Sequence, residues 1–358
     1  MRLAPAIFAC VLGGHRSLPP GQAPPHHATV HVAEVGRVSP TLVRGRYAPS
    51  PTGELHLGNA STALLAWLSI RARGGTFVMR VEDLDRNRSR DTLADQLLKD
   101  LDWLGLDWDE GPDCGGPYGP YAQWPRRPDY ERAFERLRQA GHLYPCFCTR
   151  RDIATAASAP QDPGEMRRYP GTCREIPAAE AEARAGRDER HAWRFRVVRE
   201  PPPVFDDRVW GCWGEGRSAP GDFVVYRADG VPAYQLAVVV DDAAMAIDEV
   251  VRGDDLLSST PAQLLLYDAL GLRVPVFGHV PLLLGTDRAR LSKRHRGVTL
   301  RELRDAGHGP HTVVGKLAHL LGLRPDAAPI EPCDLVAGFD LSAVTRAERG
   351  YVVDPASW

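Results

Sequence analysis

The sequence predicts an α/β fold built around a parallel β-sheet. Regular patterning begins at Val43, where residues 43–48 have the composition of a strand, and Pro49 to Gly53 then force a turn. Apolar residues follow at the i, i+3, i+4 spacing of a helix, at positions Ala60, Ala63, Leu64, Trp67 and Leu68. A second short strand is expected at 76–81. A strand–helix–strand unit of this kind places its two strands in parallel, with the helix on one face of the sheet.

The rest of the chain continues this alternation. Apolar spacing predicts one helix through Leu93, Leu97, Leu101 and Leu104, and another through Tyr130, Phe134 and Leu137. The apolar run 231–241, which ends at Asp241 and Asp242, is expected to be a buried strand, and βα alternation continues to about residue 284. The last 55 residues are expected to be helical, with one apolar face formed by Val313, Val314, Leu317, Leu320 and Leu321.

Composition indicates a globular chain and excludes several classes. The 358 residues are 43% hydrophobic and 25% charged, and no apolar run reaches the roughly 18 residues that a membrane helix needs. A net charge of -2 neither supports nor excludes a nucleic-acid partner. Seven cysteines, an odd number in a long chain, argue against a secreted disulfide scaffold, so a cytoplasmic location is expected. Residues 1–43 show no periodicity; they are interpreted as a disordered extension or the product of a misplaced start codon.

The first motif with chemical content runs from Arg46 to Asn59, between the first strand and the first helix. Nucleotides bind at this place in an open parallel sheet, because helix N-terminal amides favour phosphate oxygens. Gly58 allows a ligand to approach the backbone, and a neutral His56 could donate a hydrogen bond to a phosphate. An ordinary βα turn with a surface histidine explains this segment equally well.

The second motif is Arg290-Leu291-Ser292-Lys293-Arg294, which follows an apolar strand at 280–284. Five cations lie between residues 288 and 296, and Lys293 is one of only three lysines in the chain. A lone lysine in a loop is usually a solvated charge, but a cluster of cations with a serine is suited to binding phosphate.

Together the two motifs resemble the signatures of class I aminoacyl-tRNA synthetases. His56-Leu57-Gly58-Asn59 stands at the "HIGH" position and Arg290 to Arg294 at the "KMSKS" position. The segments RYAPSPTGELHLGN, MRVEDLD, LDWDEGPDCGGPYGPY, VPAYQLAVVVDD, VVRGDDLLSSTPAQLLLYDALG and LSKRH resemble the glutamyl branch, from about residue 44 to about 350. Arg290 departs from the lysine of many relatives, and because the charge is kept, altered tuning without loss of function is expected.

This resemblance implies a Rossmann-like catalytic domain in which the α-carboxylate of glutamate attacks the α-phosphate of ATP. His56 and Lys293 would stabilise the transition state, and Mg²⁺ would accompany ATP. The implied ATP-binding residues are His56, Gly58, Asn59, Ser292 and Lys293. The implied glutamate-binding residues are Arg46, Tyr47, Ala48, Pro49, Ser50, Glu82 for the ammonium group, Tyr234 and Arg252. A structural ion pair is the alternative interpretation of Glu82 and of Arg252.

Cysteines at 146, 148 and 173 form the third motif. Three thiols within 28 residues of an intracellular protein suggest structural zinc, with free thiols as the alternative. The spacing of Cys146, Cys148, Tyr169 and Cys173 resembles a zinc site in which a tyrosine oxygen completes three cysteines, and only this resemblance supplies the fourth ligand.

Only 65 residues follow Lys293, whereas a full glutamyl-tRNA synthetase carries a larger anticodon-binding domain there. The chain therefore resembles the truncated glutamyl-queuosine tRNA(Asp) synthetase family, which attaches glutamate to queuosine in the anticodon loop of tRNA(Asp). Implied partners are ATP, L-glutamate and tRNA(Asp) carrying queuosine, with one structural Zn²⁺, in a monomer that does not bind membranes. Alternatives are a synthetase that charges the tRNA 3′ end and a non-catalytic regulatory paralogue.

The expected organisation has five parts. They are a disordered extension (1–43), the first half of the catalytic domain (44–140), an insert with the zinc site (141–220), the second half with the KMSKS-like loop (221–298), and a helical C-terminal region without an anticodon-binding domain (299–358).

Overall fold

The computed structural model describes residues 43–149, 151–153, 169–198, 201–287, 298–344, 350–354 and 358. The predictions for residues 1–42 and for the segment with Arg290, Ser292 and Lys293 therefore lie outside the described residues.

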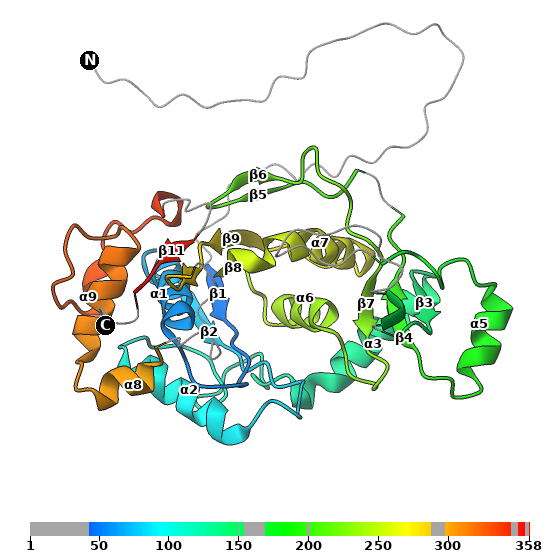
Figure 1. Cartoon of the computed structure of the whole chain (residues 1–358), viewed down its shortest axis with the longest axis horizontal. Helices are drawn as coiled ribbons and strands as arrows, with labels where there is room; N and C mark the ends of the chain where they lie inside the picture. Colours follow the sequence, from blue (N-terminus) through cyan, green and yellow to red (C-terminus); the bar gives the residue numbers. More distant parts are fainter. Residues whose placement is uncertain are drawn as a thin grey trace, which may run out of the picture. The chain divides into compact units, whose positions relative to one another are not determined.

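A six-stranded, mostly parallel sheet is the centre of the fold, which confirms the predicted α/β class (Figure 1). Its strands, in spatial order, are β2 (Thr76–Met79), β1 (Arg44–Tyr47), β8 (Glu249–Gly253), β9 (Val276–Val280), β5 (Phe205–Asp207) and β6 (Gly211–Trp213). Only β6 runs antiparallel to its neighbour. The predicted first unit is confirmed: helix α1 (Leu57–Arg71) connects β1 to β2, and its predicted apolar positions are buried.

Helices cover both faces of this sheet. Successive strand residues point to opposite faces: Phe77 and Met79 of β2 belong to one buried cluster and Val78 to another. The first cluster includes residues of α1, α2 (Asp91–Trp103), α8 (Leu300–Asp305) and α9 (Pro310–Leu320). The second includes residues of α3 (Arg127–Gln139), α6 (Tyr234–Ala244) and α7 (Thr260–Ala269). The helices predicted around residues 97, 134 and 317 are thus confirmed.

The prediction of a strand at 231–241 is wrong, because this segment contains helix α6. Helix α6 packs against α3, α7 and strand β7 (Phe223–Tyr226). Buried positions therefore occur on most of its circumference, including Leu236, Val238 and Val239. A short helix enclosed in this way shows no amphipathic period, so its apolar run cannot be distinguished from a buried strand.

A second sheet of three antiparallel strands contains β3 (Leu143–Cys146), β4 (Ala192–Phe195) and β7, and α5 (Ala178–Ala185) lies beside it (Figure 1). The expected boundary at residue 220 does not coincide with a division between sheets. Strand β5, which precedes it, pairs with β9 of the main sheet, whereas β7, which follows it, pairs with β4.

The remaining elements are short. Strands β10 (Leu283–Leu284) and β11 (Tyr351–Val352) form a parallel pair. The 3-10 helices are η1 (Trp124–Arg126), η2 (Asp254–Ser259), η4 (Pro332–Leu335) and η5 (Leu341–Ala343). Among the described residues, no helix combines the length and the apolar character needed to cross a membrane.

Candidate active site

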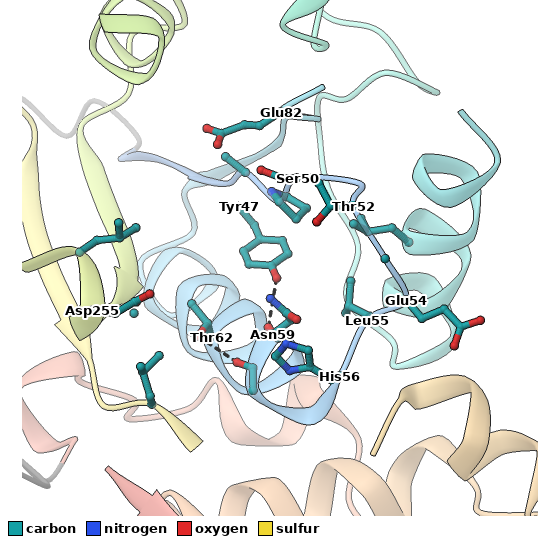
Figure 2. Close-up of a pocket in the computed structure, with 18 of the residues that line it drawn as sticks. Tyr47, Ser50, Thr52, Glu54, Leu55, His56, Asn59, Thr62, Glu82 and Asp255 are labelled. Carbon is teal, nitrogen blue, oxygen red and sulfur yellow. Dashed lines mark hydrogen bonds between the residues drawn. The ribbon is translucent and has the colours of Figure 1, made fainter. Parts of the chain in front are cut away.

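A cavity of about 620 Å³ opens at the carboxyl ends of β1, β2, β8 and β9. Chain connections leave β1 and β8 in opposite directions across the sheet, and open α/β sheets bind ligands at such a switch point. Nine predicted site residues line the cavity: Tyr47, Ala48, Pro49, Ser50, His56, Gly58, Asn59, Glu82 and Tyr234. Figure 2 shows Glu82 and His56 at opposite ends of this group, with Tyr47 between them.

His56 is the N-cap residue of α1, where its extended backbone turns the chain into the helix. Its ring packs over the first turn of the helix. A Cβ built on Gly58 would lie 3.2 Å from His56 Nδ1, so a side chain at this position would crowd the ring. Tyr47 Oη donates to the carbonyl of Asn59 at 3.2 Å and ties strand β1 to the same turn (Figure 2). The start of α1 therefore presents His56, Gly58 and Asn59 to one end of the cavity.

The segment that follows residue 297 is anchored beside His56. The amide of Leu57 donates to the carbonyl of Val298, and the amide of Leu300 donates to the carbonyl of Leu55. A capping box at the start of α8 fixes this segment, because Thr299 Oγ1 accepts from the Glu302 amide while Glu302 accepts from the Thr299 amide. Val298 and Thr299 thus lie at the His56 end of the cavity.

Beneath the cavity lies a buried network of carboxylates and guanidinium groups. Arg80 pairs with Asp242 at 2.7 Å and with Glu82 at 3.2 Å, and Arg46 pairs with Asp242 at 3.2 Å. Burial raises the pKa of the Glu82 carboxyl against the opposing effect of Arg80 and Arg46. Burial also acts to raise the pKa of Asp242, but Arg46 and Arg80 together outweigh it and the pKa is lowered. Glu82 is therefore both a lining residue and a member of an ion pair.

Arg252 differs from the other buried arginines in its partners. It lies at the end of β8 with 4% of its surface exposed, and it forms no ion pair among the described residues. Its guanidinium donates to His279 Nε2, Tyr234 Oη, Thr260 Oγ1 and Gln263 Oε1, all neutral acceptors. The interpretation of Arg252 as half of a structural ion pair does not match this arrangement, because its positive charge has no carboxylate partner there.

The structure also identifies residues that sequence reasoning missed. Lining residues outside the predicted set are Thr52, Gly53, Glu54, Leu55, Thr62, Leu97, Gly253, Asp255, Leu256, Leu282 and Leu283. A Cβ built on Gly253 would lie 2.6 Å from Asp255 Oδ1 and 2.8 Å from Leu282 Cδ2, so only glycine fits there. The signal that points to this group is position, since these residues follow the carboxyl ends of β8 and β9. Arg46 and Arg252 lie outside the lining, behind the cavity wall.

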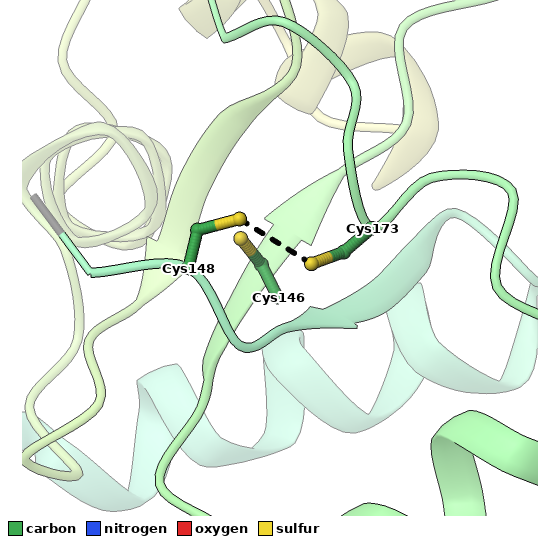
Figure 3. Close-up of side chains that lie close together, drawn as sticks. All are labelled: Cys146, Cys148 and Cys173. Carbon is green, nitrogen blue, oxygen red and sulfur yellow. Dashed lines mark hydrogen bonds between the residues drawn. The ribbon is translucent and has the colours of Figure 1, made fainter. Parts of the chain in front are cut away.

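The three predicted cysteines lie together in the second sheet region (Figure 3). The sulfurs of Cys146, Cys148 and Cys173 are all within 4.8 Å of one another, and Tyr169 Oη lies 3.3 Å from Cys146 Sγ and 3.4 Å from Cys148 Sγ. Tetrahedral zinc with Zn–S bonds of about 2.3 Å places its sulfurs about 3.8 Å apart. Three thiols and a phenol oxygen at this spacing fit a structural zinc site.

Comparison with known proteins agrees with the fold and the site. A family model described as "tRNA synthetases class I (E and Q), catalytic domain" matches residues 42–329. A solved glutamate tRNA ligase from Elizabethkingia meningosepticum, in complex with its amino acid, aligns with a TM-score of 0.73 and 29% identity over 87% of this chain and 67% of that chain. The nucleotide-binding sheet with its cavity at the switch point is thus the catalytic domain of a class I synthetase.

Curated relatives narrow the class. A glutamyl-Q tRNA(Asp) synthetase from Symbiobacterium thermophilum is 54% identical over 85% of this chain and 94% of its own length, and one from Nitratidesulfovibrio vulgaris is 50% identical over 87% and 95%. A glutamate–tRNA ligase from Acidithiobacillus ferrooxidans is 43% identical over 86% of this chain and 64% of its own length. The chain belongs to the glutamyl-Q tRNA(Asp) synthetase family.

Proposed function

We propose that the protein activates glutamate with ATP and transfers the glutamyl group to queuosine in the anticodon loop of tRNA(Asp). The observation that carries this proposal is the cavity at the carboxyl ends of β1, β2, β8 and β9, lined at one end by the first turn of α1 and at the other by Glu82. In adenylate formation the glutamate α-carboxylate attacks the α-phosphate and pyrophosphate leaves. The protein's contribution is positioning and charge stabilisation.

The His56 end of the cavity is the proposed ATP site. The amides at the start of α1, with Gly58 and Asn59 in the lining, suit phosphate oxygens. Lys293 precedes Val298 by five positions, so its Cα lies within about 18 Å of the Val298 backbone that bonds Leu57. Ser292 and Lys293 are therefore able to reach this end, where Lys293 and His56 would stabilise charge on the phosphates and Mg²⁺ would accompany ATP.

The Glu82 end is the proposed amino-acid site. Residues 46–50, Glu82, Tyr234 and Arg252 surround it, with Arg46 and Arg252 behind the wall. Glu82 is suited to the substrate ammonium group. Arg252 has no carboxylate partner among the described residues, so it is suited to a substrate carboxylate. Glutamate requires this combination of one carboxylate and a free guanidinium charge.

The acceptor is tested by locating the labelled nucleotide. We expect radiolabelled glutamate, supplied with ATP, to become attached to the queuosine nucleoside of tRNA(Asp) and to no other nucleotide after nuclease digestion. tRNA(Asp) with guanosine at that position is the control and should remain unlabelled. Label on the 3′-terminal adenosine would instead support the glutamate–tRNA ligase activity for which relatives at 40–46% identity are named. Failure of glutamate-dependent pyrophosphate exchange would favour a non-catalytic paralogue.

We further propose that Cys146, Cys148, Cys173 and Tyr169 hold one structural Zn²⁺, which would organise the segment between β3 and β4. The guanidinium of Arg194 lies 3.9 Å from the centroid of the Tyr169 ring, and a cation in this position favours negative charge on the phenol oxygen. The sulfurs lie in the β3–β4–β7 region, and none of the four residues lines the cavity. The metal would therefore support the shape of a surface for RNA and take no part in adenylate formation.

A cysteine substitution tests this site. The wild-type protein should contain about one zinc per chain, and Cys148→Ser should lose most of it and lower Tm by about 5 °C or more. Transfer to tRNA should fall more than pyrophosphate exchange. Cys114→Ser, at an exposed cysteine outside the cluster, should keep the wild-type metal content. Zinc-free wild-type protein, purified without chelator, would exclude the site, whereas normal metal content in the Cys148→Ser variant would exclude this ligand alone.

A further inference from the structure

We propose that Asp207 and His279 are positioning residues for Arg252, and that they aim its guanidinium at the carboxylate of the amino-acid substrate. The inference rests on the proposed function and deepens it, because it identifies what makes one arginine of the pocket selective for an anionic substrate.

The three side chains form a row across three neighbouring strands. In the sheet order β8–β9–β5, Arg252 is registered opposite His279, and Asp207 opposite Phe277. His279 Nδ1 lies 2.6 Å from Asp207 Oδ2, and Arg252 Nε lies 2.9 Å from His279 Nε2. All three residues are buried, with His279 fully enclosed. A continuous chain of hydrogen bonds thus runs from β5 to the pocket.

Asp207 determines which imidazole nitrogen carries the proton. Its carboxylate also accepts from the backbone amides of Val209, Trp210 and His279. Burial acts to raise the pKa of Asp207, but these donors outweigh it and lower the pKa, so the group is ionised and can only accept. Burial lowers the pKa of His279 to about 4, so the ring is neutral. Its single proton therefore lies on Nδ1, and Nε2 is left to accept from Arg252.

The remaining bonds of Arg252 orient its free edge. Nε is held by His279, and the two N–H groups of Nη2 have acceptors in Thr260 and Gln263 at 2.9 and 2.8 Å. Nη1 has only the longer contact of 3.4 Å to Tyr234 Oη, and Tyr234 lines the cavity. Because Asp207 has its own backbone donors and does not pair with Arg252 directly, the guanidinium charge stays available for a carboxylate that enters beside Tyr234.

The decisive variant is Asp207→Asn, which keeps the shape and the acceptor for the amides of Val209 and Trp210. The amide NH₂ would face Nδ1 and move the imidazole proton to Nε2, so that two N–H donors oppose each other at Arg252. In pyrophosphate exchange we expect KM for glutamate to rise at least about 10-fold while KM for ATP stays within about twofold. Asp206→Asn, at the exposed neighbouring position of β5, should leave both values unchanged.

A double variant and a conservative variant separate positioning from general structural support. In an Arg252→Ala background, adding Asp207→Asn should change KM for glutamate less than about twofold, because the two act in one chain. His279→Gln, whose amide can donate to Asp207 and accept from Arg252, should bind glutamate better than His279→Leu. Equal rises of both KM values, multiplied effects in the double variant, or equal defects in the two His279 variants would overturn the inference.

The outcomes also distinguish this inference from the proposed function. A wild-type protein that supports no glutamate-dependent exchange would contradict the function itself. Wild-type exchange, together with an unchanged KM for glutamate in Asp207→Asn, would contradict only the positioning role.

Discussion

Replacing Lys293 with alanine is expected to lower kcat for glutamate-dependent pyrophosphate exchange by about 10²- to 10³-fold, the usual effect of removing one group that stabilises transition-state charge. The cation would act mainly on charge that builds up on the phosphates, so glutamate binding should survive and its KM should change only a few fold. Steady-state exchange kinetics over both substrates measure this split.

Lys99→Ala is the matched control for Lys293→Ala. The chain has three lysines, and Lys99 is exposed on helix α2, away from the cavity lining. This variant should retain wild-type kinetics. A Lys293→Ala variant with kcat within a few fold of wild type would remove Lys293 from the proposed mechanism.

Arg252→Ala is expected to raise KM for glutamate about 10- to 100-fold with much less change in KM for ATP, because a charge-assisted hydrogen bond to the substrate carboxylate is lost. The buried acceptors of Thr260, Gln263 and His279 would also lose their donor, so some loss of thermal stability should accompany the kinetic defect. Exchange kinetics and thermal unfolding of the same samples separate the two effects.

Arg273→Ala is a suitable control, because Arg273 is an exposed arginine whose ion pair with Asp248 lies at the solvent surface. It should leave both KM values near wild type. If Arg252→Ala raised the two KM values together, the selective role of Arg252 in binding glutamate would be wrong. Arg252→Lys should recover little, since an ammonium group cannot hold the planar set of contacts of the guanidinium.

Local sequence was sufficient for the first β1–α1–β2 unit and for the family. Residues 44–79 follow one another through strand, turn, helix and strand, so the apolar spacing and the turn residues report their structure directly. The motif from Arg46 to Asn59 lies in the same short stretch, and most of it lines the cavity. The spacing of Cys146, Cys148 and Cys173 likewise predicted a cluster that the fold brings together.

Tertiary structure decided what depends on contacts between distant segments. Helix α6 could not be recognised because its burial comes from α3, α7 and β7, which its own period does not record. Arg46 and Arg252 look equivalent in sequence, yet Arg46 is paired with Asp242 whereas Arg252 meets only neutral acceptors among the described residues. Asp207 joins the pocket through a strand 45 residues before Arg252. Sheet register and burial determine these pairings, and neither is encoded in the local pattern of any one segment.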